Sequence, residues 1–158
     1  MLLLSEKLLE CMKYNNKDVS VWWKNSSARL WLNSMFLPMA FMEDEREQLL
    51  SKIIDIDDPD SKRQLTMEEP DKLFCLSYSE VLFYLPNEEE RTAEVTEYAK
   101  EMGALKDNKT NYGSWWLRTP GDLDLSWTRR VTNAGGLTTI KVNSDKFCIR
   151  PALWVKQK

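Results

Sequence analysis

Short segments that begin after helix-capping residues follow one another through the first two thirds of the chain. Ser, Thr and acidic residues favour a helix start because they satisfy backbone N–H groups or the positive end of the helix dipole. The pattern predicts a helix that Ser26 or Ser27 caps and that reaches about Met35. It also predicts helices over 43–50, over 80–85 after Ser77 or Ser79 and before Pro86, and from Thr96 to Met102 with Gly103 at the end.

Strand-like segments dominate the last third of the chain. The apolar run 73–76 predicts one buried strand, and glycines and turn residues separate further short strands at 115–118, 127–131, 137–142 and 147–155. Along 137–142, a period of two places Ile140 and Val142 on one face and Thr139 and Lys141 on the other, which should meet solvent. Helices followed by strands predict an α+β fold with a small, mostly antiparallel sheet, whereas residues 55–63 read as a loop.

Length and charge narrow the class of protein. The 158 residues suffice for a single domain, 1–158, with a real core, and no apolar run approaches the roughly 20 residues of a membrane span. The net charge is -3 and the basic residues are scattered, so we expect no nucleic-acid partner and no membrane insertion. Met1–Leu4 is too short for an export signal, which predicts a cytoplasmic chain as written.

The three cysteines, Cys11, Cys75 and Cys148, are odd in number and far apart in apolar sequence. We therefore predict three reduced, buried thiols and no disulfide. The chain has no histidine, so the three thiols lack the fourth ligand of a usual structural zinc site. We therefore expect neither a metal nor a cofactor. The acidic run 55–60 is interpreted as a solvated loop, because Asp60 and Thr66 replace the Gly and Glu of a calcium loop.

Several segments, in order over nearly the whole chain, resemble an uncharacterised bacterial domain family. These segments are Ser27-x-Arg29-x-Trp31-Leu32-Asn33, Asp71-Lys72-Leu73-Phe74-x-Leu76-Ser77, Thr96-x-Tyr98-Ala99-Lys100, Trp115-Trp116-Leu117-Arg118-Thr119-Pro120-Gly121 and Ile149-Arg150-Pro151-Ala152-Leu153-Trp154. That family looks like the formylglycine-generating-enzyme-like branch of the C-type-lectin-like superfamily, and relatives occur as variable proteins of diversity-generating retroelements. The resemblance implies a C-type-lectin-like fold, shortened at its N-terminus because family members carry strands before Leu2.

The family's chemistry does not carry over to this sequence. Formylglycine-generating enzymes need a closely placed reactive cysteine pair, and iron-dependent relatives need histidines. Where the family reads Gly-Val before its final Arg-Pro-Ala-Leu-Trp, this chain has Cys148 and Ile149. Glu69-Pro70-Asp71 is similar to a segment of calcium-dependent lectins but lacks a Trp-Asn-Asp partner. We therefore expect the protein not to be an enzyme.

Large aromatic and basic residues inside apolar runs are interpreted as structural. We expect Arg118 and Arg150 to be buried in bidentate pairs with carboxylates, an anion pocket being the alternative interpretation. The tryptophans in these runs should fill the core. This structural set is Trp31, Trp115, Trp116, Arg118, Arg150 and Trp154.

Residues 122–147 mix large, apolar and charged types without a clean period, which suits a ligand-binding surface, an ordinary polar β surface being the alternative interpretation. Trp127 should be its partly exposed anchor, with Arg129 and Arg130 nearby. The remaining predicted contact residues are Asp122, Asp124, Thr139, Lys141, Asn143 and Asp145. The leading hypothesis is a non-enzymatic recognition domain for an unidentified protein or glycan. The alternatives are an assembly domain of a larger cell-surface or phage protein and, third, a formylglycine-generating-type enzyme.

Overall fold

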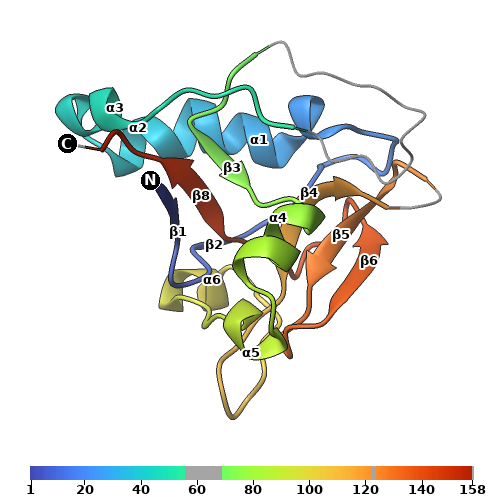
Figure 1. Ribbon diagram of the computed structural model, residues 1–158. Helices are drawn as coiled ribbons and strands as arrows, with labels where there is room; N and C mark the ends of the chain where they lie inside the picture. The colour runs from blue at the N-terminus through green and yellow to red at the C-terminus, as the bar shows by residue number, and fades with distance from the viewer. Residues whose placement is uncertain (56–68, 122–123, 158) are drawn as a thin grey trace.

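Two sheets organise the computed structural model, which describes residues 1–55, 69–121 and 124–157 (Figure 1). A three-stranded antiparallel sheet has the order β1 (Leu2–Leu4), β8 (Pro151–Trp154), β3 (Leu73–Cys75). A five-stranded sheet has the order β2 (Glu10–Cys11), β7 (Cys148–Ile149), β4 (Trp115–Pro120), β5 (Trp127–Val131), β6 (Leu137–Lys141). Its pairs are antiparallel except for β4 with β7. The last third therefore supplies most of the strands, as the sequence predicts.

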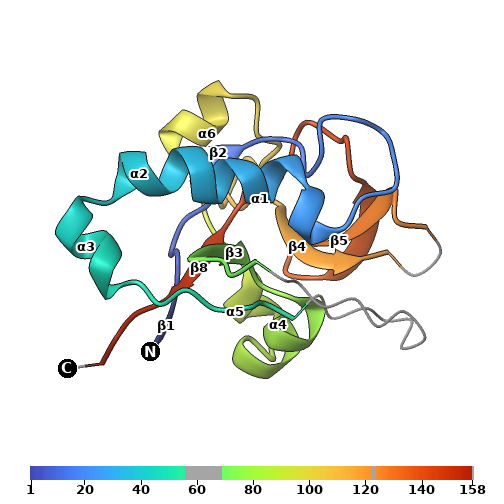
Figure 2. The same cartoon turned by 90° about the horizontal axis from the view of Figure 1, so that it is seen from above.

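The helices are short and lie mostly before residue 102. They are η1 (Trp23–Asn25), α1 (Ser27–Trp31), the π-helical turn η2 (Leu32–Phe36), α2 (Leu37–Ala40), α3 (Glu43–Gln48), α4 (Tyr78–Tyr84), α5 (Glu88–Arg91) and α6 (Glu97–Glu101). Figures 1 and 2 show the continuous run from α1 to α2 along one side of the sheets, with α4 and α5 on another. This arrangement confirms the α+β class.

Side-chain caps start the helices where the sequence predicts them. Ser26 accepts a hydrogen bond from the backbone N–H of Arg29, Ser77 from that of Glu80, and Thr96 from that of Ala99. Gly103 follows α6 in the left-handed conformation, with φ +96°. The elements β1, β2 and α5 were not predicted, because their few residues carry too little pattern to identify.

The predicted end of the first helix near Met35 is wrong, because the helical run continues to Ala40. The backbone N–H of Leu37 bonds to the carbonyl of Leu32, which is the five-residue step of a π-helix. Pro38 follows directly in α2 and has no backbone N–H to donate to the turn before it. The π turn thus lets the chain pass a proline without ending the helix.

Aromatic side chains fill much of the hydrophobic core. Trp115 and Trp116 are fully buried. The ring of Trp116 lies 5.9 Å from Tyr14 and 5.3 Å from Phe147, measured between centroids. Trp31 and Trp154 pack against this core while remaining partly exposed: Trp31 stacks on Phe36 at 5.0 Å, and the Nζ of Lys52 lies 3.9 Å above Trp154.

Arg118 pairs with a carboxylate, as the sequence predicts. Its Nη1 and Nη2 atoms lie 2.6 and 3.0 Å from the two carboxylate oxygens of Glu80. Nη1 also donates to the carbonyl of Cys75 at 2.9 Å, and Nε donates to that of Asp55 at 2.6 Å. This buried guanidinium therefore ties α4 to β3 and to the segment before residue 56.

The predicted carboxylate partner of Arg150 is wrong. Its Nε donates to the carbonyl of Ser5 at 2.9 Å and its Nη1 to that of Arg91 at 3.3 Å, while the guanidinium lies 5.0 Å from the Trp115 ring centroid. In the described part of the chain, no carboxylate lies within ion-pair distance. Arg150 separates β7 from β8, where the chain passes from one sheet to the other, and it satisfies carbonyls there. Burial lowers the pKa of this guanidinium to about 10.

The two ends of the described chain meet in the three-stranded sheet. Leu2 pairs with Trp154 across β1 and β8, and the amino group of Met1 donates to the carbonyl of Val155 at 2.9 Å. Figures 1 and 2 both place the ends side by side. No helix in the described ranges is both long and apolar enough to cross a membrane.

Candidate functional site

The predicted contact residues lie mainly on the β5–β6 hairpin, whose paired positions keep one register. Successive side chains of a strand point to opposite faces. Trp127 and Arg129 of β5 therefore share one face with their cross-strand neighbours Lys141 and Thr139. We refer to these four residues as the Trp127 face.

Trp127 is the most apolar member of this face, and its side chain is 37% exposed. The Nζ of Lys141 lies 5.5 Å from its ring centroid, which is cation–π distance. The same ammonium group lies 3.2 Å from the Oγ of Ser126 and 3.5 Å from a carboxylate oxygen of Asp18. Trp127 therefore presents a flat apolar ring to solvent, and the ammonium group of Lys141 is held in place beside it.

Arg129 stacks on an aromatic ring at the edge of the same face. Its guanidinium carbon lies 4.2 Å from the ring centroid of Tyr78, the first residue of α4. Both side chains are half-buried. The stacking fixes the planar guanidinium against helix α4 and places a second positive charge two residues from Trp127.

Backbone hydrogen bonds brace the position of Trp127. Its N–H donates to the carbonyl of Asp124 at 3.0 Å, and its carbonyl accepts from the N–H of Gly121 at 2.8 Å. A side chain at Gly121 would meet the Cβ of Trp127 at 2.8 Å, so this close approach requires glycine. The carboxylate of Asp124 accepts from the backbone N–H and hydroxyl of Ser126, each at 2.8 Å, and these bonds lower the pKa of Asp124. Asp124 therefore stabilises the turn before β5.

The prediction that Arg130 lies close to Trp127 and Arg129 on one surface is wrong. Arg130 points to the opposite side of the sheet, where its guanidinium carbon lies 4.4 Å from the ring centroid of Phe147. The period of two within β5 separates neighbouring residues 129 and 130, a signal that the sequence already contained. The residues of 122–147 that were predicted to form one surface therefore lie on both faces of the sheet.

The remaining predicted contact residues lie at the margin of the hairpin or beyond it. Asn143 is half-buried and Asp145 exposed, both in the connection from β6 to β7, and Asp122 lies outside the described residues. Thr139 and Lys141 are half-buried, so the expectation that they face solvent is only partly met. The described geometry brings together Trp127, Arg129, Thr139 and Lys141, with Asp124 supporting them.

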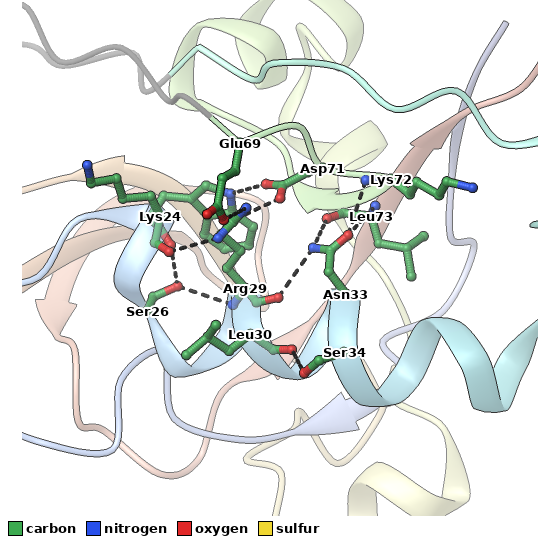
Figure 3. A network of polar contacts seen from close by, with 11 residues as sticks. Lys24, Ser26, Arg29, Leu30, Asn33, Ser34, Glu69, Asp71, Lys72 and Leu73 are labelled. Carbon is green, nitrogen blue, oxygen red and sulfur yellow. Dashed lines mark hydrogen bonds and ion pairs between the residues drawn. The ribbon is translucent and has the colours of Figure 1, made fainter.

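A buried ionic network links two segments that the sequence analysis quoted only as family features (Figure 3). The carboxylate of Asp71 accepts from the Nε of Arg29 at 2.7 Å and from the indole N–H of Trp23 at 2.8 Å. Burial raises the pKa of Asp71 because the charged form loses water, although both donors act in the opposite direction. Its buried, paired position indicates that Asp71 holds α1 to the start of β3.

Asn33, in the adjoining turn η2, makes a second connection to the start of β3. Its Oδ1 accepts from the backbone N–H groups of Lys72 and Leu73, each at 3.1 Å, and its Nδ2 donates to the carbonyl of Leu73 at 2.8 Å (Figure 3). These bonds occupy both ends of the amide. Asn33 and Arg29 therefore serve the fold, which explains their place in the quoted segments.

Comparison with known proteins identifies a family over almost the whole chain. A family model described as "Domain of unknown function (DUF6273)" matches residues 1–157. The chain belongs to this family. No curated protein and no solved structure matches it.

The DUF6273 domain holds three free, buried cysteines, as the sequence predicts. Cys11 and Cys148, far apart in the sequence and in different strands, face each other directly across β2 and β7. A hydrogen bond between these thiols lowers the pKa of Cys11 and raises that of Cys148. Burial raises the pKa of Cys75 to about 12. The sequence could not show this pairing, since 136 intervening positions separate the two cysteines.

Metal-ligating side chains form no cluster in the described ranges of the DUF6273 domain. No group of three or more His, Cys, Asp or Glu side chains in those ranges is arranged to hold a metal ion. On the Trp127 face, an exposed ring lies beside two positively charged side chains.

Proposed function

We propose that this protein is a non-enzymatic ligand-recognition domain of C-type-lectin-like fold, and that its ligand contacts the Trp127 face. The observation that supports the proposal most strongly is the 37% exposure of Trp127 on a strand braced by Gly121 and Asp124. Trp and Arg are enriched among the residues that dominate binding energy, and a preordered side chain loses little entropy on binding.

The chemistry of the face indicates what the ligand must offer. An indole ring accepts an apolar or flat surface, such as the C–H face of a sugar or an aromatic side chain. Lys141 and Arg129 add donors and positive charge beside it. We therefore propose a glycan or protein ligand that presents an apolar surface next to hydroxyl or carboxylate oxygens.

Binding screens against glycan and surface-protein arrays test this proposal, followed by titration of two variants with each hit. We expect Trp127→Ala to weaken binding by about 2 kcal/mol, roughly 30-fold, without lowering the melting temperature by more than about 2 °C. Tyr98→Ala is the matched control, since Tyr98 is 54% exposed on α6, and it should leave the affinity unchanged.

Two outcomes would contradict the proposed site. If Trp127→Ala binds every hit as tightly as the wild type, the ligand contacts another surface. If no ligand emerges from either array, the alternative of an assembly domain in a larger cell-surface or phage protein gains support, because single exposed hydrophobic side chains are common on ordinary surfaces.

Because the chain resembles variable proteins of diversity-generating retroelements, we propose further that it comes from a bacterium and that its binding face is diversified. The surrounding DNA tests this directly. We expect a neighbouring reverse transcriptase gene and a near-copy of the codons for residues 115–154. A gene neighbourhood without either would leave recognition by a fixed, undiversified face.

One observation favours the enzymatic alternative, in which the domain acts like a formylglycine-generating enzyme. The chemistry needs two close thiols, and Cys11 and Cys148 are cross-strand neighbours. Both thiols are buried, however, and Cys148 keeps its proton more firmly than an ordinary thiol. Copper-dependent oxidation of a substrate thiol by the purified protein, lost in Cys11→Ser, would establish this activity in place of the non-enzymatic role.

A further inference from the structure

A pocket of about 400 Å³ lies on the opposite side of the five-stranded sheet from Trp127. Arg130 of β5 lines one wall, and Ser114 and Phe147, which precede β4 and β7, line another. Lys106 and Asp107 come from the segment between α6 and β4, and Asn133 from the β5–β6 turn. The volume is within the usual range for small-molecule sites.

Arg130 is held in place before any ligand arrives. Its guanidinium lies over the ring of Phe147 at 4.4 Å, and its Nη1 donates to the hydroxyl of Ser114 at 2.8 Å. Its Nε is buried without a hydrogen-bond partner in the described part of the chain. No described residue accepts a hydrogen bond from Nη2, so this nitrogen is left for a ligand. A half-buried cation without a carboxylate partner has lost part of its hydration, and a bound anion would offset that cost.

The other charged groups of the pocket leave an excess of positive charge. The lining contains two cations, Arg130 and Lys106, against one carboxylate, Asp107. The Oδ1 of Asp107 accepts from the N–H groups of Lys109 and Thr110 at 2.8 and 2.9 Å and from the Thr110 hydroxyl at 3.1 Å. Asp107 thus stabilises its own turn, and neither cation pairs with it within ion-pair distance. The pocket is positive in a chain whose net charge is -3.

We propose that this pocket binds the anionic group, a carboxylate or a phosphate, of a small molecule through Arg130 and Lys106. Ser114 and Phe147 orient the guanidinium, and its free edge together with the Lys106 ammonium receives the anion. Guanidinium groups suit both anions because their planar N–H donors match pairs of oxygens. Since Arg130 and Trp127 lie on opposite sides of the sheet, this site does not rest on the proposed recognition face.

Titration of the ¹⁵N-labelled protein with sodium phosphate, sodium acetate and sodium chloride at matched ionic strength tests the proposal. We expect saturable shifts of the Ser114 and Arg130 amide signals with phosphate, acetate or both, and none that saturate with chloride. The stronger of the two ligands identifies the anion class. A site with a millimolar dissociation constant would be filled at about 50 mM ligand. If neither phosphate nor acetate gives saturable shifts up to that concentration, the proposal is overturned.

Two lysines provide a matched pair of variants for the same titration. Lys106→Gln removes a charge from the pocket, and Lys109→Gln removes the same charge from an exposed position in the adjacent turn. We expect about a tenfold loss of affinity for the first and less than about a twofold loss for the second, because exposed charges are screened. Equal losses in both variants would mean general charge attraction and would refute a built site.

Arg130→Gln should abolish saturable binding while the melting temperature reports whether the fold survives. If that variant unfolds, the comparison of Lys106→Gln with Lys109→Gln still decides the question, since neither lysine contributes a side chain to the core. Retained binding in a folded Arg130→Gln variant would contradict the role given to Arg130.

Discussion

At the scale of single residues, the surroundings of a buried polar side chain decide how it is accommodated. Arg118 is accommodated because Glu80 and two backbone carbonyls accept its hydrogen bonds. Cys75 is fully buried, and burial raises the pKa of its thiol to about 12, so the folded protein keeps it neutral. The same side chain in the unfolded chain has an ordinary pKa of 9.0.

This difference predicts a loss of stability in alkaline solution. Between the unfolded pKa of 9.0 and the folded pKa of about 12, the folded state binds more protons than the unfolded state at Cys75. The free energy of unfolding should therefore fall as pH rises, by up to about 1.4 kcal/mol per pH unit from this thiol. Urea unfolding at pH 8.5, 9.5 and 10.5 measures the slope. Cys75→Ala lowers stability throughout but should show a shallower slope, and an unchanged slope would contradict the assignment.

At the scale of secondary-structure elements, caps and turns decide where the short helices and strands begin and end. The β5–β6 turn is held because Gly135, with φ +85°, passes close to helix α5. A side chain at Gly135 would place its Cβ 1.9 Å from the carbonyl oxygen of Glu88. Arg91 of α5 adds a hydrogen bond from its Nη1 to the carbonyl of Gly135 at 3.4 Å. The hairpin and α5 therefore form one packed unit.

We expect Gly135→Ala to destabilise the protein by at least about 3 kcal/mol, because backbone strain and a steric clash add together. Gly103→Ala is the matched control: it also has a positive φ, +96°, but a new Cβ would meet nothing within 4 Å. That control should cost only about 1 to 2 kcal/mol. Chemical denaturation of the two variants measures the difference, and equal losses would show that the contact with Glu88 relaxes freely.

At the scale of the whole molecule, aromatic contacts join segments that are distant in the sequence. Trp116 is fully buried between Tyr14 and Phe147, and its indole N–H donates to the carbonyl of Met12 at 2.8 Å. The three rings come from the N-terminal segment, β4 and the segment before β7. Removal of the central ring leaves a cavity that these separate segments cannot easily close.

Trp116→Ala should therefore lower the free energy of unfolding by about 3 to 5 kcal/mol. Trp127→Ala deletes the same side chain from an exposed site and should cost less than about 1 kcal/mol, since surface substitutions have small effects. Urea titrations of both variants provide the comparison. A Trp116→Ala protein that unfolds at the wild-type urea concentration would show that Trp116 is not a core residue.

The amino-acid sequence by itself determined the features that depend on neighbouring residues. Ser26, Ser77 and Thr96 cap helices, and the bounds of β5 agree with the predicted strand, because a cap or a strand alternation is decided within a few positions. The α+β class followed from the order of these segments. The same local alternation would have placed Arg129 and Arg130 on opposite faces, so that error lay in the interpretation rather than in the sequence.

Tertiary structure alone decided which distant groups meet. Three features join segments that are far apart in the chain. They are the bonds from Arg150 to backbone carbonyls, the pairing of Cys11 with Cys148, and the pocket around Arg130. A guanidinium accepts carboxylates and backbone carbonyls alike, so residue types cannot predict which partner it finds. The pairing of the strands decides which partner the guanidinium finds, because only the folded backbone fixes which acceptors remain unpaired beside the guanidinium.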